Sequence, residues 1–258
     1  MTRLLALLYA VAAYAVFLLT SLYAIAFVSG FDFVPRHVDK GPGAPLAQAL
    51  TIDVALLLLF AVQHSGMARP GFKRWWTRLV PRHVERSTYV LASSLVLILL
   101  FWQWRPLPAV VWQVDGPARV ALFALAACGW LLVLVGTFLI NHFELFGLRQ
   151  AWFHMRGLPP DRDVPFVERA FYRIVRHPLM LGFVVAFWAA PTMTLGHLLF
   201  ALATSGYILV AVRFLEERDL VAHYGETYRD YQRRVPMILP LPRRSARDTG
   251  AARPMAAP

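Results

Sequence analysis

The chain alternates between long apolar runs and short segments rich in arginine. Four runs are each long enough to cross a hydrocarbon core of ~30 Å as a helix; they cover residues 4–28, 46–67, 88–104 and 120–140. A fifth apolar stretch, 179–214, is too long for one crossing and is interrupted at 189–192 by Pro191. Since proline removes a backbone donor and clashes with the preceding turn, this stretch predicts two shorter helices in a hairpin.

Composition places these runs in a membrane. The chain has 258 residues, of which 58% are hydrophobic and 16% charged, and its mean hydropathy is +0.52. Such values exclude an ordinary soluble domain. We therefore predict an all-α integral membrane helical bundle, with four full spans plus the proline-broken hairpin.

The distribution of cations predicts the orientation. The net charge is +11, but the basic residues gather between apolar runs and in the tail, which favours cytoplasmic loops and anionic lipid over nucleic acid as their partner. The cation-rich segments 69–86 and 149–176 follow the second and fourth runs, so the amino terminus is expected inside. A bacterial inner membrane is the expected location, with the active site facing the cytoplasm.

Three regions are expected along the chain. Residues 1–140 form a four-helix membrane region, and residues 141–240 form a second region with a cytoplasmic loop, the hairpin and a closing helix that carries Tyr224, Tyr228 and Tyr231. Residues 241–258 form a basic tail, expected to be disordered because of its composition. Asp53 lies in the middle of the second run and should face other helices, in either a structural or a functional role.

Polar clusters flank the hairpin on both sides. Arg176, His177 and Pro178 precede it, while Glu216 and Glu217 follow it. If the hairpin folds back on itself, the two clusters meet on one side of the membrane. Charged groups at such a place indicate a functional site.

The two clusters suit a zwitterionic ligand. His177 is pushed toward an extended backbone by the following proline, and Pro178 suits the first turn of a helix. The free N–H groups of that turn, with Arg173 or Arg176, could bind a carboxylate or phosphate. The carboxylates at the other end lie at a helix carboxyl terminus and need cations. Arg213 could supply a cation to Glu217. A ligand ammonium group, such as that of S-adenosyl-L-methionine, could supply a cation to the other carboxylate.

Ordered motifs in this region resemble a known superfamily. They are Tyr172-x-x-x-Arg176-His177-Pro178-x-x-x-Gly182 and Glu216-Glu217-x-x-Leu220-x-x-x-Tyr224-Gly225-x-x-Tyr228-x-x-Tyr231-x-x-x-Val235-Pro236. Together they are similar to the carboxyl-terminal signature of the isoprenylcysteine carboxyl methyltransferase and phospholipid methyltransferase superfamily.

Further segments resemble a narrower group, the membrane-bound methanethiol S-methyltransferases, which are relatives of the NnrU-like proteins. These segments are His64-Ser65-x-Met67-Ala68-Arg69-Pro70, Glu85-Arg86-Ser87-Thr88-Tyr89-Val90, residues 141–150 and Pro191-Thr192-Met193-Thr194-x-Gly196-His197.

The resemblance implies methyl transfer from S-adenosyl-L-methionine to methanethiol, giving dimethyl sulfide and S-adenosyl-L-homocysteine, with hydrogen sulfide as a further acceptor. It places these residues around the cofactor: Gln150, Tyr172, His177, Pro178, Leu179, Met180 and Glu216. The superfamily often has tyrosine where this chain has Met180, which puts an aromatic contact there in question. Arg176 and Glu217 join the cofactor-binding set through the charge argument above.

The thiol proton needs an acceptor, for which the candidates are His154, His142 and Glu144, in the loop after the fourth run. Each could instead be an interfacial residue without a catalytic role. Their spacing matches no strong metal motif, so no metal is expected. The expected partners are a small volatile thiol and membrane lipid, with no obligate protein partner. Two alternatives stay open: methylation of a larger lipophilic acceptor, such as a prenylcysteine carboxyl group or a phospholipid, and a non-catalytic NnrU-like membrane protein.

Overall fold

The computed structural model describes residues 2–159 and 168–240. Within them, five helical segments are long and apolar enough to cross a membrane. Four match the predicted runs: α1 (Arg3–Ser29), α2 (Leu46–Ala68), α4 (Arg82–Gln103) and α5 (Gly116–Ile140). The fifth is Leu195–Tyr224. The prediction of an all-α membrane bundle is confirmed, and the tail 241–258 lies outside the described residues.

The hairpin differs from the prediction in one arm. The break at Pro191 is confirmed, because α8 (Pro178–Trp188) ends just before it and α9 (Leu195–Ala211) begins just after it. The second arm, however, is not short. A π-helical turn, η2 (Val212–Glu216), joins α9 to α10 (Glu217–Tyr224), so the helix continues for 30 residues.

Short elements complete the described chain. Two strands, β1 (Val110–Gln113) and β2 (Thr192–Thr194), pair antiparallel at the hairpin tip and are the exception to the helical prediction. The described segments between and after the spans contain short helices: α3 (Pro70–Trp76), α6 (His142–Leu145), α7 (Leu148–Arg156), η1 (Ala170–Arg173) and α11 (Glu226–Arg234).

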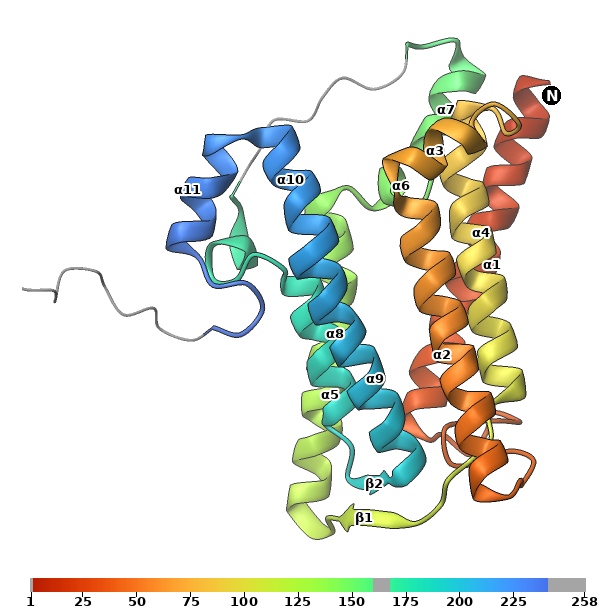
Figure 1. The fold of residues 1–258 in the computed structure, drawn as a ribbon, viewed down its shortest axis with the longest axis vertical. Coiled ribbons are helices and arrows are strands. Elements are labelled where there is room, and N and C mark those ends of the chain that lie inside the picture. Colours follow the sequence, from red (N-terminus) through yellow and green to blue (C-terminus); the bar gives the residue numbers. More distant parts are fainter. Residues whose placement is uncertain (1, 160–167, 241–258) are drawn as a thin grey trace, which may run out of the picture.

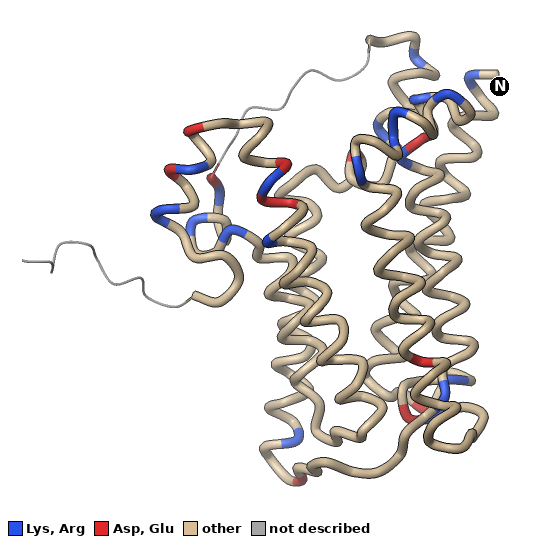
Figure 2. Tube along the Cα trace, in the orientation of Figure 1, with Lys and Arg blue, Asp and Glu red and all other residues tan. Residues whose placement is uncertain are grey.

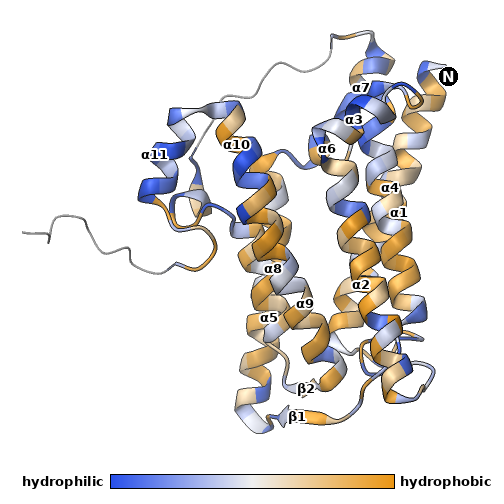
Figure 3. Cartoon of the chain, in the orientation of Figure 1, coloured by the Kyte–Doolittle hydropathy of each residue, from blue (hydrophilic) through white to orange (hydrophobic). Residues whose placement is uncertain are grey.

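The spans form two groups that meet in an aromatic core. In one group α1 and α2 pack against α4, with α7 covering α1 and α4, and in the other α5 packs against α8, which contacts α9 (Figure 1). Phe27, Phe101, Phe187 and Phe200 belong to one buried cluster that joins the groups. Apolar residues dominate the middle of the helices, and polar residues gather at their ends (Figure 3).

The closest helix contact lies between α5 and α8. A Cβ atom on Gly129 would lie 2.7 Å from the backbone nitrogen of Ala186, and one on Gly182 would lie 2.7 Å from the backbone oxygen of Gly129. The two backbones therefore touch where only glycine fits, as at small-residue crossings in membranes. This contact fixes the position of α8, and with it that of His177 at its start.

Asp53 faces other helices, as predicted. Its side chain is fully buried, and its Oδ1 accepts a hydrogen bond of 2.9 Å from the backbone N–H of Arg105. The carboxylate thus provides a hydrogen-bond acceptor for a backbone N–H just after α4, where the helix has ended.

Candidate active site

The segment before α8 is held in place by the chain that follows α11. The backbone N–H of Arg176 donates to the carbonyl of Pro236 at 2.9 Å, and that of His177 donates to the carbonyl of Met237 at 3.0 Å. His177 has the non-helical backbone that a following proline favours, and Pro178 opens the helix, as predicted. The imidazole is therefore presented from a fixed backbone at the mouth of the hairpin.

The two polar ends of the hairpin meet, as the sequence predicted. The Nδ1 atom of His177 lies 3.5 Å from Oε1 of Glu216, and its Nε2 atom lies 3.3 Å from Oε1 of Glu217. Because α8 and α9 run in opposite directions, the start of α8 faces the end of the long helix. The π-helical turn places the two adjacent carboxylates on either side of one imidazole ring.

Arg176 and Glu217 form a buried ion pair. Oε1 of Glu217 lies 2.6 Å from both Nε and Nη2 of Arg176, and the two side chains are 5% and 3% exposed. The remaining Nη1 of Arg176 donates to the carbonyls of Gln232 and Val235. The expectation that Arg213 neutralises Glu217 is wrong, because a cation from across the fold is closer and buried. Arg176, expected to bind cofactor, is instead occupied within the protein.

Glu216 differs from its neighbour in being open to solvent. Its side chain is 45% exposed, against 3% for Glu217. Burial alone would lower the pKa of His177, but hydrogen bonds and the charges of the two glutamates outweigh burial and raise this pKa to about 9. The imidazole is thus positively charged at neutral pH. Glu216 contacts His177 at 3.5 Å and keeps an accessible carboxylate.

The short helix α11 covers this cluster. Gly225, with a φ of +60°, turns the chain after α10, and α11 then folds back so that Nε2 of Gln232 donates to Oε2 of Glu217 at 3.0 Å. The Tyr231 hydroxyl donates to the carbonyl of Tyr172 at 2.5 Å. Burial, together with the negative charge of Glu216, raises the pKa of the Tyr172 phenol. The predicted closing helix is therefore present only in part: α11 carries Tyr228 and Tyr231, which pack inward, whereas Tyr224 ends α10 on the other side of the turn at Gly225.

Leu179 and Met180 occupy the first turn of α8. Leu179 lies against Gly136 of α5, and Met180 packs with Ile208, Val212 and Ile238. Both side chains are only half-buried. They form the apolar border of the His177 cluster.

His142, one of the predicted proton acceptors, is held on both ring nitrogens. Its Nε2 lies 2.7 Å from the Tyr14 hydroxyl and its Nδ1 lies 2.8 Å from the Thr137 hydroxyl, while its ring stacks on Phe138. Burial lowers the pKa of this imidazole. These contacts tie α6 to α1 and α5.

The other residues predicted from this loop are also engaged with protein. Glu144 accepts from Asn141 at 2.6 Å and pairs with Arg149 at 3.2 Å. The His154 ring stacks on His83 with centroids 3.6 Å apart. Gln150 donates from Nε2 to the carbonyl of Glu144, and its Oε1 is buried without a hydrogen-bond partner. The loop thus packs on α1 and α4 (Figure 1), and none of its contacts reaches His177 within the described chain.

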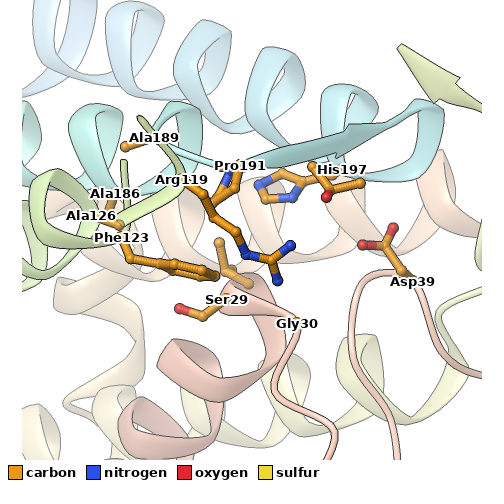
Figure 4. A pocket seen from close by; sticks show the side chains of 13 residues that line it. Ser29, Gly30, Asp39, Arg119, Phe123, Ala126, Ala186, Ala189, Pro191 and His197 are labelled. Atoms are coloured by element: carbon orange, nitrogen blue, oxygen red, sulfur yellow. The ribbon is translucent and has the colours of Figure 1, made fainter. Parts of the chain in front are cut away.

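Two cavities lie apart from the His177 cluster. One, of about 380 Å³, is bordered by α1, α6 and α7, with Asn141, Arg149 and Trp152 in its wall. The other, of about 220 Å³, lies at the hairpin tip, where Arg119 reaches in and Asp39 and His197 border it (Figure 4). Since α8 separates the tip from His177, this second cavity opens toward the opposite end of the molecule.

Sequence reasoning did not include several residues of the cluster. Gln232 and the carbonyls of Val235, Pro236 and Met237 hold Arg176, Glu217 and the His177 backbone. Val235 and Pro236 appeared only as the end of the superfamily motif, with no role assigned, and Gln232 and Met237 belonged to no motif, because the role of all four depends on the turn at Gly225. A second group, around His64 and Tyr89, entered only through the resemblance; it joins α2, α4 and α9 through hydrogen bonds.

Comparison with known proteins agrees with this architecture. Residues 54–240 match the NnrU protein family. The chain is 59% identical to the methanethiol S-methyltransferase of Mycobacterium tuberculosis, over 95% of this chain and 99% of that protein. It is 53% identical to the methanethiol S-methyltransferase of Pseudomonas deceptionensis, over 82% and 80%, and 32% identical to mouse nurim, over 67% and 68%.

No solved structure matches the chain. The match to the NnrU protein family covers most of the sequence and includes α2 from Val54 onward and every later helix of the described chain. The chain belongs to the NnrU family.

Proposed function

We propose that this protein transfers the methyl group of S-adenosyl-L-methionine to methanethiol and releases dimethyl sulfide, with hydrogen sulfide as a further acceptor. Relatives named methanethiol S-methyltransferase, at 59% and 53% identity, support the reaction. The exposed carboxylate of Glu216, which lies beside His177 at the hairpin mouth, supports this region of the fold as the donor site.

The donor carries an ammonium group and a carboxylate on its amino-acid end. In the proposal, Glu216 binds the ammonium group from its exposed side, since 3.5 Å between Glu216 and His177 leaves no room for a ligand between them. The exposed guanidinium of Arg173 and the first turn of α8 are available to the carboxylate. Tyr172, Leu179 and Met180 would border the rest of the molecule.

Arg176 and Glu217 take a supporting role in this proposal. Their buried pair fixes the start of α8 against α10 and α11, so that Glu216 keeps its position. A charge held in place by its surroundings binds a ligand without the cost of ordering. Breaking the pair should therefore disturb the site through its geometry.

The reaction suits a site away from bulk water. A thiolate that attacks a sulfonium methyl group converts two opposite charges into two neutral products, and such charge loss is favoured where water is excluded. Holding both partners in line removes much of the entropic barrier. What the chain must supply is donor binding, alignment and an acceptor for the thiol proton.

The cation distribution supports a cytoplasmic site. Lys and Arg residues are dense at the end that carries α3, α7, α10 and α11 and sparse at the β1–β2 end (Figure 2). Positive residues mark the cytoplasmic side of membrane proteins. The His177 cluster lies at the cation-rich end, where a soluble cofactor of the cytoplasm can reach it.

The proposal is tested with purified protein, methanethiol and S-adenosyl-L-methionine that carries a deuterated methyl group. We expect dimethyl sulfide with one deuterated methyl group in the headspace, measured by gas chromatography with mass spectrometry. No product while S-adenosyl-L-homocysteine binds saturably would overturn the acceptor assignment, and product with only unlabelled methyl groups would overturn the donor assignment. Absence of saturable binding would overturn the donor assignment.

A further inference from the structure

A polar cluster lies within the apolar part of the bundle, where α2, α4 and α9 meet. Gln63, His64 and Ser65 supply it from α2, Tyr89 and Ser93 from α4, and Tyr207 from α9. The function proposed above uses none of these side chains. Polar residues at such depth are costly and usually functional, although some only join helices.

His64 lies at the centre of this cluster. The Tyr89 hydroxyl is 3.0 Å from both ring nitrogens of His64, and the Ser93 hydroxyl is 3.3 Å from Nδ1. Phe60 stacks on the ring at 5.1 Å between centroids. Tyr89 and Ser93 are buried, whereas the His64 side chain is half-buried and thus accessible from one side. The imidazole of His64 is therefore oriented by two hydroxyl groups and an aromatic ring.

One acceptor in the cluster has no partner. The Nε2 of Gln63 donates to the Ser93 hydroxyl at 3.3 Å and lies 3.1 Å from the Met67 sulfur. The Oε1 of Gln63 is buried and has no hydrogen-bond partner among residues 2–159 and 168–240. Leaving such an oxygen unsatisfied costs free energy. With Phe60 and Met67 beside it, the cluster offers apolar contacts and a spare acceptor, which is what a small thiol requires.

The position relative to Glu216 fits the reaction. Ser65 and Tyr207 are hydrogen-bonded at 2.9 Å, so His64 lies near the level of Tyr207. Nine residues separate Tyr207 from Glu216, about 13 Å of helix at ~1.5 Å per residue. In the donor, four bonds of roughly 1.5 Å separate the ammonium nitrogen from the sulfur, so these atoms lie about 5 Å apart.

An attacking thiol lies ~3 to 3.5 Å from the methyl carbon. A donor anchored at Glu216 and extended along α9 would therefore bring its methyl group to about the level of His64 along the helix axis. The ion pair between Arg69 and Asp219, 3.2 Å long, holds the ends of α2 and α10 together on the same side. Both groups of helices would thus enclose the reacting atoms.

We propose that the acceptor thiol binds beside His64, and that the imidazole of His64 takes the thiol proton during methyl transfer. The inference rests on the function proposed above. The S–H bond breaks and an N–H bond forms on the imidazole. The thiolate sulfur then bonds to the methyl carbon, and the pair of the old carbon–sulfur bond stays on the donor sulfur, giving S-adenosyl-L-homocysteine. The imidazolium returns its proton to water, and nothing is oxidised or reduced.

Tyr89 has a positioning role in this scheme. Its hydroxyl holds the imidazole edge, and the guanidinium of Arg86 lies 5.2 Å from its ring centroid. Removing the hydroxyl should leave His64 present but less well oriented. Glu144, predicted from the loop after α5, is less suitable because its carboxylate is paired with Arg149 and accepts a hydrogen bond from Asn141.

The test compares two thiols in His64→Gln and Tyr89→Phe variants. Methanethiol must lose its proton, whereas 2,2,2-trifluoroethanethiol is far more acidic and is largely thiolate near neutral pH. We expect His64→Gln to lower kcat/KM for methanethiol by about 100-fold or more, as for a general base, and to lower it much less for the acidic thiol. Tyr89→Phe should show the same selective loss, about 10-fold for methanethiol, because a misoriented base transfers the proton less efficiently.

Binding of S-adenosyl-L-homocysteine, measured by calorimetry, shows that each variant is folded and keeps its donor site. His197→Gln is the matched control, since His197 is a buried histidine at the opposite end of the hairpin, bonded to the Phe187 carbonyl; its rates should stay within about threefold. Equal losses for both thiols, or no loss, would overturn the proposal. If the His64→Gln variant does not bind S-adenosyl-L-homocysteine, the ratio of the kcat/KM losses for the two thiols in Tyr89→Phe decides the proposal instead. Wild-type protein that makes no sulfide would instead refute the underlying function.

Discussion

Glu216 and Glu217 are adjacent in sequence, yet the structure assigns them different tasks. Glu216 is exposed and proposed to bind the donor ammonium group, whereas Glu217 is buried against Arg176. The variants Glu216→Gln and Glu217→Gln remove the same charge from neighbouring positions. They therefore form a matched pair in which one should change ligand binding and the other should change stability.

The expected loss for Glu216→Gln is one charge-assisted hydrogen bond to the ligand. Such a bond contributes about 1.5 to 3 kcal/mol, which corresponds to a rise in Kd of roughly 10- to 150-fold. The fall in Tm should be smaller than for Glu217→Gln, because the contact between Glu216 and His177 is 3.5 Å long and open to solvent.

The expected loss for Glu217→Gln is a buried partner. Removing one member of a buried ion pair leaves the other charge uncompensated and costs about 3 to 5 kcal/mol. Since 1 kcal/mol shifts the midpoint of a domain of this size by about 2 to 4 °C, the Tm should fall by roughly 6 to 20 °C. The hydrogen bond from Gln232 to Oε2 is lost or weakened as well.

Calorimetric titration with S-adenosyl-L-homocysteine gives Kd, and the change in tryptophan fluorescence on heating in detergent gives Tm. We expect a crossed result: weaker binding with a small fall in Tm for Glu216→Gln, and a larger fall in Tm for Glu217→Gln. Unchanged affinity in Glu216→Gln would refute the assignment of the ammonium site. Unchanged Tm in Glu217→Gln would refute the structural role of the buried pair.

Three further predictions concern the parts that hold the site. Folding raises the pKa of His177 from 6.5 to about 9, so the protonated imidazole stabilises the folded state fully below pH 6.5, and this stabilisation is lost as pH rises through about 9. Tm should fall over this interval, and His177→Gln should flatten the dependence of Tm on pH. Gly182→Ala places a methyl group 2.7 Å from the Gly129 carbonyl oxygen, which should push α8 away from α5 and lower Tm. Gly206→Ala, whose methyl group would have nothing within 4 Å, should not lower Tm. Equal Tm values for the two variants would contradict the close packing of α5 and α8. Tyr231→Phe removes the hydrogen bond to the Tyr172 carbonyl and should cost about 1 kcal/mol, seen as faster proteolysis after α10; an unchanged rate would contradict the closing role of α11.

The spans could be predicted from the sequence because run length and polarity determine them. The breaks at Pro191 and after the second and fourth runs predicted the number of crossings. They also predicted that the two ends of the hairpin lie on the same side of the membrane. The extension of the second arm was not predictable in the same way. Charged residues 213–219 end the apolar run, but the backbone continues as a π-helical turn and α10, since hydrogen bonding along a helix does not require an apolar sequence.

The site could be predicted only in part. The contacts of His177 with Glu216 and Glu217 follow from antiparallel arms, whereas the partner of Glu217 depends on how α11 returns after Gly225. A local rule favoured Arg213, one helical turn before Glu217, but burial makes the Arg176 contact stronger. Contacts between segments distant in sequence decide this cluster, and a single sequence does not display them. The division of the chain at residue 140 stays a prediction, and α5 and α8, from its two sides, pack closely.

The most direct measurement of the central claim is an experimental structure of the protein with S-adenosyl-L-homocysteine bound. The account predicts the ammonium nitrogen within hydrogen-bonding distance of the Glu216 carboxylate, about 2.7 to 3.2 Å, and the sulfur directed along α9 toward His64. A ligand bound instead in the cavity of Asn141, Arg149 and Trp152, or at the β1–β2 end, would contradict it.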